Sequence, residues 1–409
     1  MTQRRFGRIL AASAALVALV GLATACSSSS TSTSSATSGA GSSMGGSSTN
    51  SALPSLDALY KGTETTPPTS APTPVKGKSI YWISCGQQVP DCATKAKEGQ
   101  AASAALGWDF HLIDGNIGTG GAYASGIRTA IAAKADAIVE DAFPCPDVQQ
   151  PLQEAKAAGI LVIGMETLDC SDSGGPQLFT ANIQYNATET DQASYWRGFG
   201  AHSADYLIAA SGGKAKIINN PGQNTQQQML NQGFLDEIKK CSGCQIVDTV
   251  KWSTSDYVPN GPWIAAFRSS LVKHPEATAV YMPFDSMPAS LGGSQAIREA
   301  GRKICTGNGP FGSDCMIGVG GIGTNEALDL IRNGQWTALG SARDDRWVAW
   351  AVVDELNRAF NKQPAVPEGV GLRAIDAGHG LPTTPGTPYQ TSVDFRAAYL
   401  KAWGVSSGS

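Results

Sequence analysis

From residue 77 onward the chain alternates short β-branched runs with Ala-rich helical stretches, and this alternation limits the fold more than any other feature. In the first half, strands are predicted at 79–84, 110–114, 137–141, 160–166 and 178–183, and helices at about 93–106, 122–134 and 147–158. The order strand–helix–strand implies parallel sheets with helices on both faces. The strands are continuous apolar runs, as burial on both faces requires.

The same organisation starts again in the second half, although no sequence repeat accompanies it. Strands are predicted at 215–220, 245–252, 279–285, 316–320 and 337–342, and helices near 188–210, 224–240, 262–273, 287–300, 325–333 and 344–361. We therefore predict an α/β fold of two lobes, each a doubly wound parallel sheet. Ligands of open α/β sheets bind beyond the carboxyl ends of the strands, and pockets favour domain interfaces, so the cleft between the lobes is the expected binding site.

Residues 1–26 have the features of an export signal rather than of a folded element. Three arginines among the first eight residues precede an apolar run at 9–22, which is too short to span a bilayer. The run closes with Leu-Ala-Thr-Ala-Cys26, which resembles a bacterial lipoprotein cleavage box. This resemblance implies that Cys26 carries lipid and anchors the protein to the outer face of the cell membrane. The alternative is ordinary secretion with free release.

The segment 27–76 is rich in Ser, Thr, Gly and Pro and nearly devoid of aromatic residues, so we expect a disordered tether. About 330 residues follow, which suits two lobes better than a single core. Without the signal, 27 basic residues stand against 34 acidic ones, a net charge of −7. This balance does not indicate a nucleic-acid partner, which would favour a basic patch.

Nine cysteines bear on the compartment and on cross-linking. With Cys26 assigned to lipid, eight remain, and pairing by proximity gives the disulfides Cys85–Cys92, Cys145–Cys170, Cys241–Cys244 and Cys305–Cys315. Eight cysteines allow 105 connectivities, so this pairing is a hypothesis. It fits structural cross-links in an oxidising compartment. A redox role for Cys241-Ser-Gly-Cys244 is the alternative, but this pair lies at the end of a predicted helix rather than at its start, where a thiolate would be stabilised.

Several ordered stretches resemble type I periplasmic binding proteins of ABC importers, of the ribose- and galactose-binding kind. The stretches that carry the resemblance are 98–100, 106–114, 135–139, 157–163, 232–234, 274–275 leading into 279–281, and 317–320. It covers about 77–380 and implies three hinge crossings, near 183, 342 and 371, so that the helix from Asp344 returns to the first lobe. The implied lobes are 77–182 plus 343–371 and 183–342 plus 372–405.

The resemblance also implies a function. It predicts a monomeric, non-enzymatic binding protein without cofactors, which closes on a small solute and delivers it to an ABC permease with its ATPase. The alternative is a sensing protein that presents its ligand to a receptor kinase; an adjacent permease gene or an adjacent kinase gene would discriminate between the two.

The chain departs from its sugar-binding relatives at the positions of their polar clamp. Relatives often have Asp-Arg, Arg, Asn-Asp and Asp where this chain has Glu166-Thr167, Leu230, Phe284-Asp285 and Gly320. Buried sugar hydroxyls without partners would each cost on the order of 1–3 kcal/mol. We therefore expect a ligand that is less polar than a free hexose, or cationic, or aromatic.

Other residues offer a replacement set for the lost clamp. Phe143, Tyr257, Trp263 and Phe284 offer flat faces, and Glu166 offers a charge partner for a cation. The candidate ligand-binding residues are Gln87, Gln88, Phe143, Glu166, Gln228, Tyr257, Phe284, Asp285, Gly320 and Arg343. Each has a structural alternative: Phe284 can pack in the core, and the glutamines around Gln228 open a helix, where at least one faces solvent.

Rival chemistries receive little support. Residues 318–323 fit the dinucleotide pattern G-x-G-x-x-G, with Asp344 at the distance of a ribose acid. The motif lies late in the chain, however, and Asp344 is expected to open a helix, where an acid is stabilised in any case. The four histidines lack the paired spacing of metal ligands, so we expect no metal site.

Overall fold

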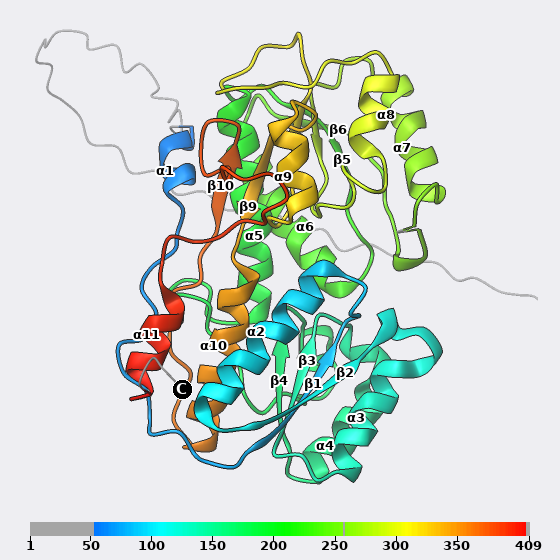
Figure 1. Ribbon diagram of the computed structural model, residues 1–409. Coiled ribbons are helices and arrows are strands. Elements are labelled where there is room, and N and C mark those ends of the chain that lie inside the picture. The colour runs from blue at the N-terminus through cyan, green and yellow to red at the C-terminus, as the bar shows by residue number, and fades with distance from the viewer. Residues whose placement is uncertain (1–52, 257, 406–409) are drawn as a thin grey trace, which may run out of the picture. The chain divides into compact units, whose positions relative to one another are not determined.

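The computed structural model describes residues 53–256 and 258–405, and the predicted signal, Cys26 and most of the predicted tether lie outside this range. Within it, the strands form two sheets (Figure 1). The first sheet has the order β2-β1-β3-β4 and contains β1 (Ser79–Ser84), β2 (Asp109–Asp114), β3 (Ala137–Asp141) and β4 (Leu161–Met165). The second has the order β10-β9-β8-β7-β5-β6 and contains β5 (Lys216–Asn219), β6 (Gln245–Thr249), β7 (Ala279–Tyr281), β8 (Ile317–Val319), β9 (Ala338–Ala342) and β10 (Arg373–Asp376).

Both sheets are parallel except for β10, which pairs antiparallel with β9. The helices are α1 (Leu56–Lys61), α2 (Pro90–Leu106), α3 (Ala122–Ala132), α4 (Gln149–Ala157), α5 (Gln192–Ala210), α6 (Thr225–Ile238), α7 (Pro262–Lys273), α8 (Gly293–Glu299), α9 (Asn325–Arg332), α10 (Asp345–Phe360) and α11 (Phe395–Ala402). The predicted α/β fold of two parallel-sheet lobes is thereby confirmed. None of these helices in the described part of the chain is long and apolar enough to cross a membrane.

Local signals explain most element boundaries. All residues of β3 are buried: its apolar run Ala-Ile-Val predicts this, and the two acids that follow, Glu140 and Asp141, are buried as well. Helix α2 begins with Pro90 in its first turn and ends at Gly107, which adopts the left-handed conformation (φ 73°) common at helix ends. Helix α10 begins after Asp344, whose carboxylate accepts a hydrogen bond from the backbone N–H of Arg346.

One predicted strand, 178–183, does not form and is corrected here. Leu178 and Phe179 are buried, but their backbone N–H groups donate to the carboxylate of Asp169 instead of a neighbouring strand. Only an isolated bridge joins Ala181 to Ile163 of β4. The apolar run therefore anchors a loop to the lobe core, which periodicity alone cannot distinguish from a strand.

We call the first sheet with α2, α3, α4 and α10 the N-terminal lobe, and the second sheet with α5 to α9 the C-terminal lobe. Helix α10 packs against α2 and β4, so the chain returns to the N-terminal lobe after β9 (Figure 1). Between β4 and β10 the chain thus passes between the lobes three times: from β4 to α5, from β9 to α10 and from α10 to β10. The predicted crossing points near 183, 342 and 371 lie in these three passages, and a bridge between Gln184 and Pro367 joins the first passage to the third.

Two predicted boundaries are wrong. Residues 53–76 were expected to belong to the disordered tether, but they form α1 and an extended segment that is hydrogen-bonded to both lobes. The last part of the predicted C-terminal lobe, 395–405, forms α11 and packs on α10 of the N-terminal lobe. There Trp403 donates from Nε1 to Asp354 at 2.6 Å.

Candidate functional site

Charged side chains gather at the carboxyl edge of the N-terminal sheet, which is the edge where ligands of open α/β sheets bind. Asp141 ends β3 and Glu166 directly follows β4. Arg343 directly follows β9, in the second of the three passages, and Lys95 comes from the first half of α2. All four side chains are nearly completely buried. We call these residues, together with Asp91 and Asp345, the charge cluster.

Lys95 lies at the centre of the charge cluster and is fully buried. Its ammonium group donates to Oε2 of Glu166 at 2.8 Å and to Oδ2 of Asp91 at 3.0 Å, and it pairs with Oδ1 of Asp141 at 3.1 Å. Burial alone would lower the pKa of Lys95, but the three carboxylates, with Asp141 first, hold it well above its usual value. Lys95 is therefore a permanent cation.

Arg343 binds the other side of Glu166. Its Nη2 lies 2.6 Å from Oε1 of Glu166, and its Nε donates to Oδ1 of Asp345 at 2.8 Å. The guanidinium also lies over three aromatic rings of α5, those of Tyr195, Trp196 and Phe199, at 5.4–5.9 Å from their centroids. Arg343 is thus held by charge, by directed bonds and by ring contacts at once.

Burial shifts two acids of the cluster toward their neutral form, which makes the cluster less negative. Burial raises the pKa of Asp141 to about 7 and raises that of Asp345 well above its usual value. Burial acts in the same direction on Asp91, but the charges of Lys95 and Arg343 leave the pKa of Asp91 lowered. Burial therefore favours the protonated forms of Asp141 and Asp345, whereas the two cations favour the carboxylate form of Asp91.

Glu166 occupies a strained backbone position in this cluster. Its φ is 57°, in the left-handed region that costs non-glycine residues energy. The strain turns the side chain back into the buried cluster, where it meets both cations. Glu166 therefore has a definite role there, but both of its oxygens are already engaged by residues of this chain.

A small cavity of about 70 Å³ lies between the charge cluster and the C-terminal lobe. Its walls are formed by Pro90, Asp91, Thr94, Gly323, Thr324, Asn325, Arg343, Asp344, Asp345, Arg346, Pro388 and Tyr389. Three buried polar atoms of the lining residues lack a hydrogen-bond partner within the described residues: Nη1 of Arg343, Oδ1 of Asp91 and Oγ1 of Thr324. The cavity thus offers one donor, one acceptor and one hydroxyl that can do either to an incoming group.

The C-terminal lobe contributes a turn, 322–324, whose backbone N–H groups bind the carboxylate of Asp285. Asp285 is buried and accepts hydrogen bonds from the backbone N–H groups of Ile322, Gly323 and Thr324. Burial raises its pKa to about 6, although these bonds act in the opposite direction. In the dinucleotide alternative these N–H groups would bind phosphate, but here the carboxylate of Asp285 already takes that place.

Gly320, at the end of β8, allows the close approach on which this turn depends. Its φ is 128°, and a Cβ at this position would lie 1.8 Å from the carbonyl oxygen of Met282. No side chain fits there unless the backbone shifts, so glycine at this position has a local steric reason.

The structure separates the remaining predicted residues from the charge cluster. Phe143 is buried in the core of the N-terminal lobe and stacks on Tyr123 with 4.0 Å between centroids, so its prediction as a ligand face is wrong. Gln87 bonds within its own loop, to Oγ of Ser84, and Gln88 is exposed. Gln228 is exposed and donates to the backbone of Gln223, close to the start of α6.

Phe284 is partly buried, and its ring lies edge-on to Trp252 at 6.0 Å. It packs against the apolar cores, as the structural alternative supposed. Trp263 and Leu230 are both buried in core clusters. Leu230 therefore does not line the cleft. Tyr257 lies outside the described residues.

Sequence reasoning identified Glu166 and Arg343 but missed Lys95, Asp91, Asp141 and Asp345. Two signals were available for them. Asp141 ends β3 just as Glu166 ends β4, so both acids reach the same sheet edge. Asp91 and Lys95 are four residues apart, which places them on one face of a helix that begins at Pro90, whereas the predicted helix began only at about residue 93.

All four predicted disulfides are present. The bonds Cys85–Cys92, Cys145–Cys170, Cys241–Cys244 and Cys305–Cys315 join Cα atoms 5.0–5.9 Å apart. The first two fix loops at the carboxyl edge of the N-terminal sheet. Among the described residues, the one group spaced to hold a metal is Cys85, Cys92 and Asp141, and the disulfide removes both thiolates from it.

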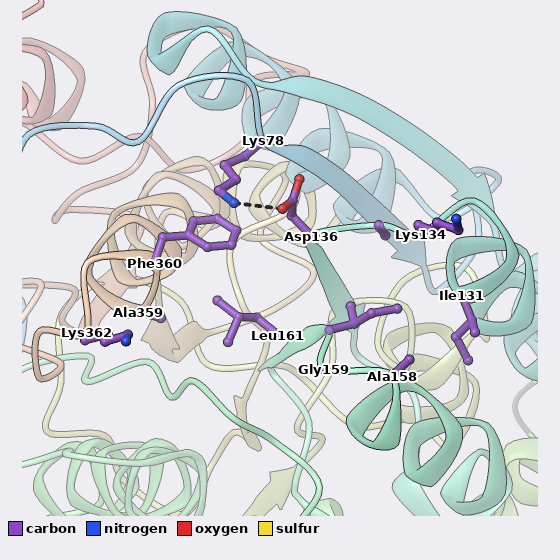
Figure 2. A pocket seen from close by; sticks show the side chains of 12 residues that line it. Lys78, Ile131, Lys134, Asp136, Ala158, Gly159, Leu161, Ala359, Phe360 and Lys362 are labelled. Carbon is purple, nitrogen blue, oxygen red and sulfur yellow. Dashed lines mark hydrogen bonds and ion pairs between the residues drawn. The ribbon is translucent and has the colours of Figure 1, made fainter.

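A larger hollow, of about 590 Å³, lies at the opposite edge of the N-terminal sheet (Figure 2). Its rim carries Lys78, Lys134 and Lys362, and apolar side chains such as Leu161 and Phe360 line it. Lys78 pairs with Asp136 at 2.7 Å. The other two lysines follow the ends of α3 and α10, where cations are stabilised by the helix dipole. Because this hollow lies at the amino ends of the strands, we do not assign the ligand site to it.

Comparison with known proteins finds a matching family model and similar solved structures. A family model described as a periplasmic binding protein domain matches residues 92–363. A glucose-galactose binding protein from Geobacillus stearothermophilus superposes with a TM-score of 0.59 at 17% identity, covering 74% of this chain and 98% of that one. The arabinose-binding component of an ABC transporter from Shewanella sp. ANA-3 gives 0.56 at 18% identity, covering 73% and 91%.

A solute-binding protein from Bacillus halodurans C-125 with bound myo-inositol gives a TM-score of 0.55 at 15% identity, covering 75% of this chain and 97% of that one. At such identities the likeness concerns the fold. No curated protein matches the sequence.

Proposed function

The chain belongs to the periplasmic binding protein domain family, and on that premise we propose that it is the solute-binding component of an ABC importer. The observation that carries the proposal is the cavity between the charge cluster and the C-terminal lobe, at the carboxyl edge of the N-terminal sheet. Pockets at such edges and between domains are the usual ligand sites of α/β proteins. We propose that the lobes close on the solute by motion about the passages near 183, 342 and 371.

The charge cluster bears on the kind of solute. Glu166 is already paired with Lys95 and Arg343, so it offers no free negative charge to a cationic ligand. An anionic ligand would approach Asp91 and Asp344, which also line the cavity. A neutral hydroxyl, by contrast, accepts from Nη1 of Arg343 and donates to Oδ1 of Asp91. The proposed ligand is therefore a small uncharged, sugar-like solute.

The C-terminal side of the cleft suits a less polar part of this solute. Phe284 is only partly buried, and Gly320 presents no side chain. Relatives have hydrogen-bonding groups at these positions. We therefore propose that part of the solute is less polar than a free hexose, because sugar hydroxyls buried against these positions would lack hydrogen-bond partners.

The size of the cavity implies that the lobes must move to admit the solute. Pockets for small molecules have volumes of roughly 300–1,000 Å³, whereas this cavity measures about 70 Å³. A hydrogen bond from Oγ of Ser173 to Oγ1 of Thr225 at 3.3 Å also joins a loop of the N-terminal lobe to α6. The described arrangement is therefore nearer to a closed form than to an open one.

The sequence also supports the placement of the protein in the cell. Because the N-terminal signal closes on Cys26, we propose that lipid on this residue anchors the protein to the outer face of the cell membrane. The permease and ATPase of the importer are then its partners, and the single binding cleft requires only a monomer.

The test is a thermal unfolding series with a divided ligand panel. One group contains L-arabinose, D-allose, allitol and myo-inositol, the second contains methylated or aromatic glycosides, and the third contains quaternary amines and aromatic acids. A ligand that binds only the folded form adds about 2.7 kcal/mol of stability at a hundred times its Kd. We expect shifts with uncharged compounds, larger in the glycoside group, and none with the charged ones.

An Arg343→Lys variant makes the test specific for the site, with Arg128→Lys as the control. Arg343 lines the cavity, whereas Arg128 is an exposed residue of α3 that pairs with Glu154. We expect the ligand-induced shift to fall in the first variant and to persist in the second. A shift with amines alone would contradict the neutral ligand, and no shift with any compound would count against solute binding at this cleft.

A further inference from the structure

The segment 62–76, which we call the strap, joins the two lobes in addition to the three passages of the hinge. One end of the strap continues α1, which packs on α5 and β10 of the C-terminal lobe. Leu59 of α1 is buried, and Tyr60 donates from its hydroxyl to Oδ2 of Asp376 at 2.5 Å. The ring of Tyr60 also stacks on His379 with 3.8 Å between centroids. This end of the strap is thus fixed to the C-terminal lobe.

The other end is fixed to the N-terminal lobe, chiefly by α10. Arg358 donates to the carbonyl oxygen of Ser70 at 2.8 Å, and Asn357 donates to that of Pro72 at 2.9 Å. Near the end of the strap, Nε1 of Trp108 donates to the carbonyl oxygen of Val75 at 2.7 Å. Side chains of the folded lobe therefore grip the strap by its backbone carbonyl groups.

Between these ends the strap lies directly on the third passage. The N–H of Thr63 donates to the carbonyl oxygen of Leu372, and the N–H of Thr65 donates to that of Gly369, both at 2.9 Å. The contact is close enough to require glycine, because a Cβ at Gly371 would lie 2.2 Å from the backbone nitrogen of Glu64. The strap and the third passage are thus paired along the hinge.

The C-terminal tail, 377–394, completes this layer. Tyr389 donates from its hydroxyl to Glu64 of the strap at 2.8 Å, and its N–H donates to the carbonyl oxygen of Gly323 in the C-terminal lobe. The N–H of Thr391 donates to the carboxylate of Asp344 at the start of α10. Beyond the tail, α11 packs on α10, so the tail is a fifth connection between the lobes.

From these contacts we infer that the strap restrains the opening of the two lobes. A hinge of three passages allows rotation, but a segment bound to both lobes must stretch or detach when they separate. The strap has little slack, because Pro67, Pro68, Pro72 and Pro74 favour an extended, semi-rigid chain. The restraint therefore favours the closed arrangement before any solute binds.

The test compares lobe separation in the full chain with that in a variant whose strap is longer. Gly-Ser-Gly-Ser inserted between Thr66 and Pro67 slackens the strap, and the same insertion between Pro275 and Glu276, in an exposed loop of the C-terminal lobe at the amino end of β7, is the control. Spin labels on noncanonical residues at Thr119 and Ser255, both exposed beyond the carboxyl ends of β2 and β6, report the separation and leave the disulfides intact.

In ligand-free protein, we expect the label distances of the strap insertion to become longer and more broadly distributed than those of the parent and the control. A Thr63→Val variant removes the bond from Leu372 N–H to Oγ1 of Thr63 at 2.9 Å and should shift the distribution in the same direction by less. If the insertion variant does not fold, the label distances in Thr63→Val test the inference instead. Distances equal to those of the parent in a folded strap variant, or an equal increase in the control, would overturn the inference.

Discussion

Glu166 and Arg343 form a buried ion pair that joins the end of β4 to the passage after β9, with 2.6 Å between Oε1 and Nη2. Both residues were expected to contact a ligand, and the structure instead pairs them with each other. Oε1 of Glu166 has no aligned hydrogen bond to Arg343, so the attraction between the two side chains is mainly electrostatic. The pair places the hinge passage against the N-terminal sheet and leaves Nη1 of Arg343 free to meet the solute.

Replacement of Glu166 by Gln should destabilise the protein strongly. The variant leaves Lys95 and Arg343 without their shared carboxylate, and loss of one partner of a buried pair typically costs about 3–5 kcal/mol. Urea denaturation measures the change in the free energy of unfolding. The matched control is Glu154→Gln, which breaks the exposed pair with Arg128 and should cost at most about 1 kcal/mol. Equal losses in both variants would contradict the structural role of Glu166.

The stability of the protein should fall between pH 4.5 and 7, in part because of Glu189. Burial raises the pKa of Glu189 to about 7. The folded state then holds a proton that the unfolded state releases above its ordinary pKa, so the contribution of this group is complete at low pH and is lost as the pH rises toward 7. One such proton changes stability by up to about 1.4 kcal/mol per pH unit.

A Glu189→Gln variant checks this assignment in the same titration of stability against pH. The amide oxygen of Gln still accepts the bond that Asn186 donates to Glu189 at 2.7 Å, but it does not titrate. We expect a shallower decline in the variant between pH 4.5 and 7 and parallel curves above pH 8. Identical slopes throughout would show that Glu189 titrates normally.

Removal of the Cys145–Cys170 disulfide should cost more than removal of Cys241–Cys244. The first bond closes a loop of 25 residues, and the second one of 3. The longer loop restricts the unfolded chain more, so the first bond should stabilise the folded state by a larger amount. A disulfide typically contributes about 2–4 kcal/mol. Unfolding of the two double Cys→Ala variants in urea measures the difference. A greater loss from the Cys241–Cys244 variant would be the opposite of this expectation.

Replacement of Gly320 by Ala should destabilise the folded protein more than most Gly→Ala replacements in the C-terminal lobe. The new Cβ would lie 1.8 Å from the carbonyl oxygen of Met282, and φ is also positive. Gly174→Ala is the control, because its φ is 81° and its Cβ meets nothing within 4 Å. The control measures the conformational cost of a positive φ alone, which is about 1–3 kcal/mol. The thermal midpoint of Gly320→Ala should be clearly lower than that of Gly174→Ala.

The sequence allowed the prediction of the fold because its signals were local. Continuous apolar runs located nearly all the strands, and the predicted strand 79–84 coincides with β1. Proximity along the chain also identified the disulfide partners. The resemblance to a known family then supplied the return of α10 to the N-terminal lobe, which no local pattern contains.

The errors concern residues whose partners lie far away in sequence. Segment 53–76 has a composition typical of disorder, yet it is ordered by groups such as Arg358 of α10. Phe143 has the chemistry of a ligand face, but the stacked ring of Tyr123 decides its position. Glu166 was identified as an unusual strand-end acid, whereas its pairing with Lys95 depends on how α2 packs against the N-terminal sheet. Such pairings follow from tertiary contacts that single-sequence patterns do not encode.

The packing of α10 and α11 on the N-terminal lobe has a consequence for the order in which the protein can mature. The sheet of this lobe comes from the first strands of the chain, but α10 covers α2 and β4 only after β5 to β9 of the C-terminal lobe have been made. A chain released before residue 345 would leave these apolar surfaces bare. Biosynthesis thus begins this lobe first and completes it last, so that a nascent or truncated chain would need protection from aggregation until its final segment arrives.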